Sequence, residues 1–116
     1  MPTVLVVEDN DDLRSLYEEA MVAEGYDVLT AANGREALDL LSGSAERPRV
    51  IVLDLMMPVM NGWVFLEHFR EEEAYRGINV VICSAAKDEA PKGVPLLKKP
   101  IDLDDLTYTV ARLCDA

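Results

Sequence analysis

The chain has 116 residues, half of them hydrophobic, and its 22 acidic against 11 basic residues give a formal net charge of -11. This length has room for one domain with one core, which we expect to span residues 1–116. The negative charge excludes a general basic surface for DNA, RNA or an anionic membrane, whereas cations and basic partners fit. No apolar run approaches the roughly twenty residues of a membrane span, and no signal peptide precedes the first strand, so we expect a soluble, cytoplasmic protein.

The first half of the chain alternates short apolar runs with amphipathic segments. Thr3 to Val7 is β-branched and does not alternate, which predicts a strand buried on both faces of a parallel sheet. From Asp11 to about Gly25 the apolar residues recur with the 3.6-residue period of a helix. Tyr26 to Ala31 predicts a second strand, and Asn33-Gly-Arg-Glu36 resembles a capping box that opens a helix through about Leu41.

The second half repeats this alternation. Strands are predicted at Val50–Leu53, Asn79–Cys83 and Val94–Lys98, and helices where Phe65, Leu66 and Phe69 share a face and where Asp102 caps a final amphipathic segment. Strands that alternate with helices predict an α/β fold with right-handed crossovers. We expect a flavodoxin-like, doubly wound sheet of five parallel strands in the order 2-1-3-4-5.

One connection is too short for this pattern. Only nine residues, Ala85 to Gly93, separate Ser84 from the fifth strand, and they include Pro91 and Gly93. A parallel crossover usually needs at least about 10 to 12 residues. The sequence therefore predicts that the fourth helix is shortened or missing.

Four of the predicted strands end in ionisable or hydroxylic residues: Glu8-Asp9, Asp54, Ser84 and Lys99. The carboxyl ends of parallel strands meet at one edge of the sheet, and ligands bind there. Neighbouring first and third strands, about 4.8 Å apart, would place Asp9 beside Asp54 with Glu8 close behind. Three carboxylates repel one another unless they bind a hard cation, so we predict a site for Mg²⁺ or Mn²⁺.

Such a site allows a specific chemistry. A carboxylate beside a divalent cation can attack phosphorus as a nucleophile and form an aspartyl-phosphate. We predict Asp54 as the acceptor, with Lys99 supplying positive charge to the phosphoryl group and the Ser84 hydroxyl donating a hydrogen bond to it. Lys99 is preferred to Lys98 because it directly precedes Pro100.

The same residues resemble the motifs of response-regulator receiver domains of the chemotaxis-regulator type. They are Val6-Val7-Glu8-Asp9-Asn10, Leu53-Asp54-Leu55-Met56-Met57-Pro58 with Gly62, Ser84-Ala85 and Lys99-Pro100, within a likeness that runs from residue 3 to about 113. The resemblance implies phosphorylation of Asp54, the acidic pair Glu8 and Asp9, and the Met56 backbone carbonyl as a metal ligand. It also implies that Ser84 is the switch hydroxyl and Lys99 the family's site lysine, and that the Lys99-Pro100 bond is cis. The donor implied by the resemblance is a histidine kinase or a histidine phosphotransfer protein. By this likeness the protein is a self-phosphorylating switch and not an enzyme with a released product.

Some features depart from the family pattern. Leu96 stands where the family usually has its switch aromatic, so we expect output through residues 87–93 or another face. Met56 and Ala86 occupy the two positions whose side chains tune hydrolysis of the phosphoryl group in the family. Neither side chain can orient an attacking water by a strong hydrogen bond, which predicts slow loss of the phosphoryl group.

Other interpretations stay open on the residues alone. Glu8 and Asp9 could cap the following helix, Asp54 could be a turn acid, and Ser84 could bond loop backbone. The chain could then be a pseudo-receiver, an interaction module without phosphotransfer. A magnesium-dependent phosphohydrolase would need a second acid near Asp54, and a flavodoxin-like carrier would need a turn after the first strand that accepts a phosphate.

Three remaining residues receive structural interpretations. Cys83 and Cys114 lie in apolar patterns without metal-ligand spacing, which predicts buried thiols. His68 lies in an amphipathic segment beside Phe69 and lacks the context of a phosphohistidine, so we expect a surface histidine.

Overall fold

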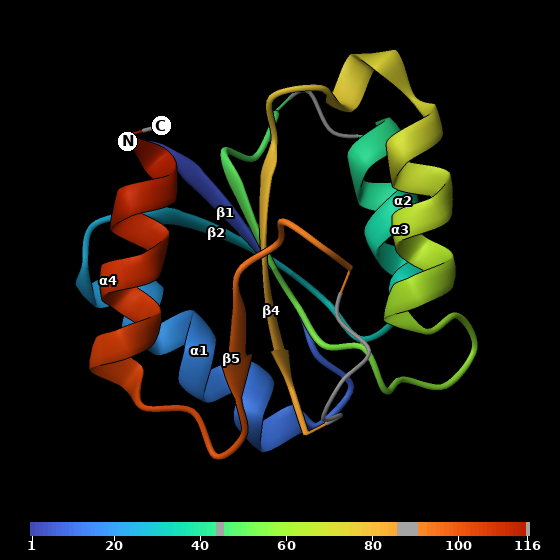
Figure 1. Cartoon of the computed structure of the whole chain (residues 1–116). Helices are drawn as coiled ribbons and strands as arrows, with labels where there is room; N and C mark the ends of the chain where they lie inside the picture. Colours follow the sequence, from blue (N-terminus) through green and yellow to red (C-terminus); the bar gives the residue numbers. More distant parts are fainter. Residues whose placement is uncertain (44–45, 86–90, 116) are drawn as a thin grey trace.

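The computed structural model describes residues 1–43, 46–85 and 91–115. Five parallel strands form one sheet in the predicted order β2-β1-β3-β4-β5 (Figure 1). The strands are β1 (Thr3–Val7), β2 (Asp27–Ala31), β3 (Val50–Leu53), β4 (Asn79–Ser84) and β5 (Leu96–Lys98). The helices are α1 (Asp11–Ala23), α2 (Gly34–Gly43), α3 (Gly62–Glu71) and α4 (Leu103–Cys114), with a 3₁₀ turn η1 (Glu73–Tyr75).

Helices cover both faces of the sheet. Figure 1 shows α1 and α4 on one side and α2 and α3 on the other. Alternate residues of β1 point to opposite sides, so Val4 and Val6 pack in the core beneath α1 and α4. Leu5 and Val7 pack in the second core, beneath α2 and α3. This two-sided burial explains why the strand sequences lack alternation, and it leaves the carboxyl ends of the strands at one edge of the sheet.

Side chains of the preceding residues start the helices. The Asn10 carboxamide oxygen accepts from the Leu13 N–H at 3.0 Å at the start of α1. Glu36 N–H donates to Asn33 at 3.0 Å, and the Glu36 carboxylate accepts from the Ala32 N–H at 3.0 Å, one residue earlier than in a regular capping box. Asp102 accepts from two backbone N–H groups of α4, as predicted. These caps satisfy backbone donors that the first helical turn leaves free.

The predicted element boundaries need small corrections. β5 begins at Leu96 and not at Val94, because Pro95 has no N–H to give to the ladder; its carbonyl accepts from the Ile82 N–H at 2.8 Å. The turn η1 was not predicted, and α2 continues to Gly43. Both cysteines are free and buried, which confirms that prediction.

The connection between β4 and β5 contains the expected departure. On either side of residues 86–90, Ala85 and residues 91–95 form bends and turns without a helix. Residues 86–90 themselves, with Ala86 and most of the segment expected to carry output, lie outside the described residues. Leu96 is half-buried and pairs with Ile82 of β4.

Among the described residues, no helix has the length and apolarity that a membrane span requires.

Candidate functional site

Three carboxylates meet at the carboxyl edge of the sheet. Glu8 and Asp9 follow β1, and Asp54 follows β3, which pairs with β1 so that Leu53 lies opposite Val7. One oxygen of each carboxylate lies within 4.8 Å of the others. Glu8 and Asp54 are 1% and 3% exposed, whereas Asp9 is open to solvent. The structure therefore brings together the acidic residues that the sequence singled out, two buried and one accessible.

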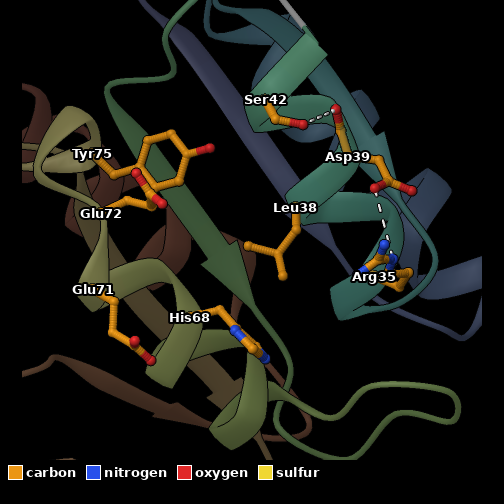
Figure 2. A pocket seen from close by; sticks show the side chains of 8 residues that line it. All are labelled: Arg35, Leu38, Asp39, Ser42, His68, Glu71, Glu72 and Tyr75. Atoms are coloured by element: carbon orange, nitrogen blue, oxygen red, sulfur yellow. Dashed lines mark hydrogen bonds and ion pairs between the residues drawn. The ribbon is translucent and has the colours of Figure 1, made fainter.

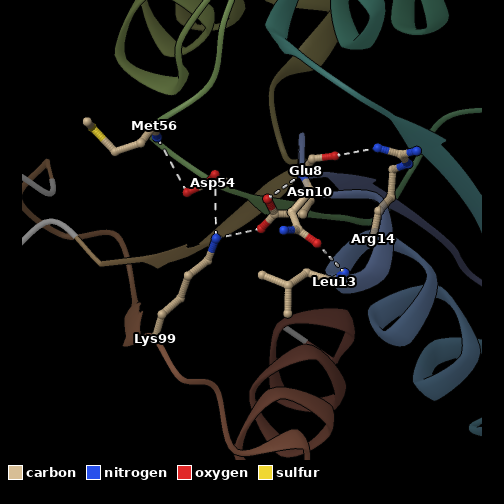
Figure 3. Close-up of polar contacts among 7 residues, drawn as sticks. All are labelled: Glu8, Asn10, Leu13, Arg14, Asp54, Met56 and Lys99. Atoms are coloured by element: carbon tan, nitrogen blue, oxygen red, sulfur yellow. Dashed lines mark hydrogen bonds and ion pairs between the residues drawn. The ribbon is translucent and has the colours of Figure 1, made fainter.

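Lys99 enters the same cluster from the end of β5. Its Nζ donates to Glu8 Oε1 at 2.7 Å and lies 3.6 Å from Asp54 Oδ2 (Figure 3). The Lys99 N–H donates to the Ser84 carbonyl at 3.1 Å, and the Lys99-Pro100 bond is cis, as the family resemblance implied. Lys98, by contrast, is exposed. The ammonium thus lies between two buried carboxylates, closer to Glu8 than to Asp54.

The charges of this cluster do not balance. Burial and, after it, the nearby Glu8 charge raise the pKa of Asp54 from its ordinary 3.8 to about 6, against the opposing effects of Lys99 and the Met56 N–H. Burial alone would lower the pKa of Lys99, but its hydrogen bond to Glu8 and the charge of Asp54 outweigh burial and raise it. The site therefore holds an ammonium firmly and still carries excess negative charge.

Ser84 and Met56 flank Asp54. Leu53 pairs with Ile82, so Ser84 lies two residues further along β4 at the same edge of the sheet, and it is fully buried. The Met56 N–H donates to Asp54 Oδ1 at 3.4 Å, while the Met56 side chain is exposed. Both residues lie where contacts to a group on Asp54 could form.

The sequence assigned no structural role to three residues that shape this edge, although two of them, Asn10 and Gly62, belong to its motifs. The Asn10 N–H donates to Glu8 Oε2 at 3.1 Å, and Arg14 Nη1 donates to the Glu8 carbonyl at 2.9 Å (Figure 3). A Cβ on Gly62 would lie 2.6 Å from the Asp54 carbonyl oxygen, so only glycine allows α3 to begin this close to the loop. Asn10 has a sequence signal, as a cap residue before a helix, but the Arg14 and Gly62 contacts depend on tertiary packing.

His68 lies elsewhere. Figure 2 shows it lining a polar cavity of about 300 Å³ between α2 and α3, with Glu71, Glu72 and the ion-paired Arg35 and Asp39. The imidazole is exposed, which confirms the prediction of a surface histidine. The Ser42 hydroxyl, which also lines this cavity, donates to the Asp39 carbonyl at 3.2 Å, and the cavity shares no lining residue with the acidic cluster.

The donor set fits a hard divalent cation. Carboxylate oxygens are the ligands that Mg²⁺ and Mn²⁺ prefer, and Mg²⁺ usually takes one or two carboxylates and completes its shell with water and phosphate oxygens. Exposed Asp9 keeps the cluster open to solvent. Among the described residues, no other group of three or more histidine, cysteine and acidic side chains could hold a metal.

Comparisons with known proteins agree with this geometry. Residues 4–111 match the family model of the response regulator receiver domain. The sensor histidine kinase TmoS of Ectopseudomonas mendocina is 36% identical over 88 residues, which are 76% of this chain and 9% of that protein. The transcriptional regulatory protein AfsQ1 of Streptomyces coelicolor is 33% identical over 77% of this chain and 37% of its own length. The chain thus spans well under half of these curated relatives.

Solved structures give the same result. The chemotaxis response regulator CheY4 of Vibrio cholerae superimposes with a TM-score of 0.86 at 31% identity, covering 97% of this chain and 98% of that one. The receiver domain of the hybrid histidine kinase CckA gives a TM-score of 0.82 at 34% identity, covering 97% and 98%. Fold, acidic edge and sequence match agree: the chain belongs to the response regulator receiver domain family of two-component systems.

Proposed function

We propose that this receiver domain accepts a phosphoryl group on Asp54 from a phosphohistidine donor, in a reaction that depends on Mg²⁺ or Mn²⁺, and thereby changes its affinity for a protein partner. The observation that carries the proposal is a buried Asp54 beside an acidic pair and an ammonium 3.6 Å away. Residues 1–116 act as one receiver unit in the cytoplasm, and the unit modifies itself as a switch without releasing a product.

The reaction is a phosphoryl transfer between two protein side chains. An oxygen of ionised Asp54 attacks phosphorus, the bond from phosphorus to the donor's imidazole nitrogen breaks, and its electron pair stays on that nitrogen. Asp54 must be ionised to attack. With a pKa of about 6, Asp54 is mostly ionised at pH 7. The product is an acyl phosphate on Asp54.

The neighbouring residues have separate roles. Glu8, Asp9, Asp54 and the Met56 carbonyl hold the cation, which when bound offsets negative charge on the phosphoryl oxygens. Lys99 brings a second positive charge, and the Ser84 hydroxyl donates to a phosphoryl oxygen. Lys99 already lies next to Asp54, so its side chain needs only a short movement away from Glu8.

The donor is a histidine kinase or a histidine phosphotransfer protein, and the domain contacts neither nucleic acid nor membrane directly. The relatives support this partner class, because they include a sensor histidine kinase and the receiver domain of a hybrid histidine kinase. We also infer slow hydrolysis of the phosphoryl group, since the thioether of Met56 accepts hydrogen bonds only weakly.

Intact mass spectrometry tests the proposal directly. The chain is incubated with acetyl phosphate, with Mg²⁺ or with EDTA, and compared with Asp54→Asn and with the control Asp12→Asn, an exposed acid outside the cluster. We expect one phosphoryl adduct that requires both Mg²⁺ and Asp54 and persists in Asp12→Asn. An adduct that survives in Asp54→Asn would refute the acceptor assignment. No adduct, together with no Mg²⁺ response of Trp63 fluorescence, would favour the pseudo-receiver.

A further inference from the structure

A groove lies where β5 is shorter than β4. β5 pairs only with Ile82 to Ser84, so Asn79–Val81 of β4 have no strand partner on that side among the described residues. A cavity of about 320 Å³ lies here, lined by the apolar side chains of Phe69, Val80 and Val94 together with the polar ones of Arg70 and Asn79. Val80 and Val94 are only half-buried. Among the described residues, the sheet is therefore only partly covered at Val80, beside α3.

A second cavity continues this groove. It measures about 180 Å³, reaches Gly77, and shares Phe69, Arg70 and Ile78 with the first cavity. The two cavities adjoin at these three wall residues, and we treat them as one depression along the C-terminal half of α3. We call it the α3–β4 groove.

The charge of the groove is opposite to that of the chain. Its charged wall residues are Arg70, Arg76 and Glu72, in a protein with twice as many acidic as basic residues. Within the described part of the chain Arg70 forms no ion pair, and the Arg76 guanidinium pairs only with Glu73, at 3.8 Å between largely exposed side chains. Two weakly engaged guanidinium groups beside an apolar floor favour an occupant with apolar and acidic side chains.

The backbone favours a helix over an added strand. Ile82 donates its N–H to Pro95, and backbone groups alternate sides along a strand, so only Val80 of the unpaired stretch directs its N–H and C=O into the groove. An added strand would thus pair with one residue, whereas a helix satisfies its own backbone and inserts apolar side chains at i, i+3, i+4 and i+7. Among the described residues, a second copy offers no spare helix, since α1 to α4 already bury their apolar faces on the sheet.

We propose that the α3–β4 groove binds an amphipathic helix of a partner protein, with the apolar stripe of that helix in the groove and its acidic side chains paired with Arg70 and Arg76. This interaction does not depend on phosphoryl transfer at Asp54.

A phage-displayed library of random 16-residue peptides, selected on the whole chain, tests the proposal. Selected peptides are synthesised with a fluorescent label, and their affinity is measured by fluorescence anisotropy. We expect the selected peptides to carry apolar residues at three- and four-residue spacing and to contain more acidic than basic residues. Arg70→Glu should weaken binding roughly tenfold. Arg35→Glu makes the same charge change on α2, outside the groove, and should leave affinity unchanged.

Val94→Asp should abolish binding, because it places a charge among the apolar side chains of the groove. Val94 is half-buried and lies in a turn, so this substitution disturbs the fold less than Val80→Asp in β4 would. The proposal is wrong if no peptide is selected, or if selected peptides show strand-like alternation or a basic excess. Equal loss of affinity in Arg35→Glu and Arg70→Glu would also overturn it. Concentration-dependent dimers in sedimentation velocity that Val94→Asp disrupts would instead assign the groove to a second copy.

Discussion

Removing the charge of Asp54 should stabilise the fold when no divalent cation is present. The pKa of Asp54 rises from 3.8 to about 6 on folding, mainly through burial and then through Glu8. A shift of this size corresponds to at most about 3 kcal/mol, because one pKa unit equals about 1.4 kcal/mol. The side chain is 4% exposed, so solvent screens little of this cost, while loss of the contact to Lys99 offsets part of it. We expect Asp54→Asn to gain about 1 to 3 kcal/mol at pH 7.5 in EDTA.

The upward direction of the Asp54 pKa shift determines how the free energy of unfolding depends on pH. A carboxyl group whose pKa is raised on folding binds its proton more tightly in the folded state. The wild type therefore gains stability as pH falls through about 6 toward 4, and the advantage of Asp54→Asn shrinks over that window. Urea unfolding followed by Trp63 fluorescence at pH 7.5 and pH 5 measures both values. Mg²⁺ should stabilise the wild type more than the variant. A variant less stable than the wild type at pH 7.5 in EDTA, or an advantage unchanged at pH 5, would refute the reasoning.

Three further substitutions test other parts of the site. Lys99→Met removes a cation that competes for the carboxylates, so Mg²⁺ affinity by fluorescence titration should rise while phosphorylation by acetyl phosphate slows roughly tenfold or more. Gly62→Ala places a Cβ 2.6 Å from a backbone oxygen and should cost about 1 to 3 kcal/mol in urea unfolding, whereas Gly43→Ala meets nothing within 4 Å and should be neutral or stabilising. Val59 has φ 66° and is 83% exposed, so Val59→Asn should raise unfolding stability by about 1 kcal/mol, and a decrease would contradict the strain argument.

The sequence predicted the sheet because burial on both faces leaves a simple signal. β1 and β3 are short, continuous apolar runs, and each run ends in an acid. Parallel strands then bring Glu8, Asp9 and Asp54 to one edge whatever the details of packing. The start of β5 was harder to predict, since the apolar run includes Val94 and the missing N–H of the next residue decides where pairing begins.

Contacts that depend on helix placement were not predictable. Arg14 reaches the Glu8 carbonyl only because α1 lies across the end of β1, and Gly62 matters only because α3 begins against the Asp54 backbone. The sequence also predicted that Lys99 contacts the phosphoryl group, but it did not predict which side chain Lys99 contacts when no phosphoryl group is present. The structure gives that partner as Glu8, because a buried carboxylate needs a compensating charge and the partly buried Lys99 ammonium supplies it.

If Asp54 is phosphorylated as we propose, the position of Lys99 limits how that change can act on the rest of the domain. Its backbone N–H is bonded to Ser84, so the end of β5 stays attached to β4 while the side chain is free to exchange Glu8 for a phosphoryl oxygen. That exchange leaves buried Glu8 without its cation, at 1% exposure. An unpaired buried carboxylate is costly, so either the divalent cation or a proton must replace the ammonium. If Asp54 is phosphorylated as we propose and the divalent cation replaces the ammonium at Glu8, phosphorylation and cation binding are coupled, and each should strengthen the other.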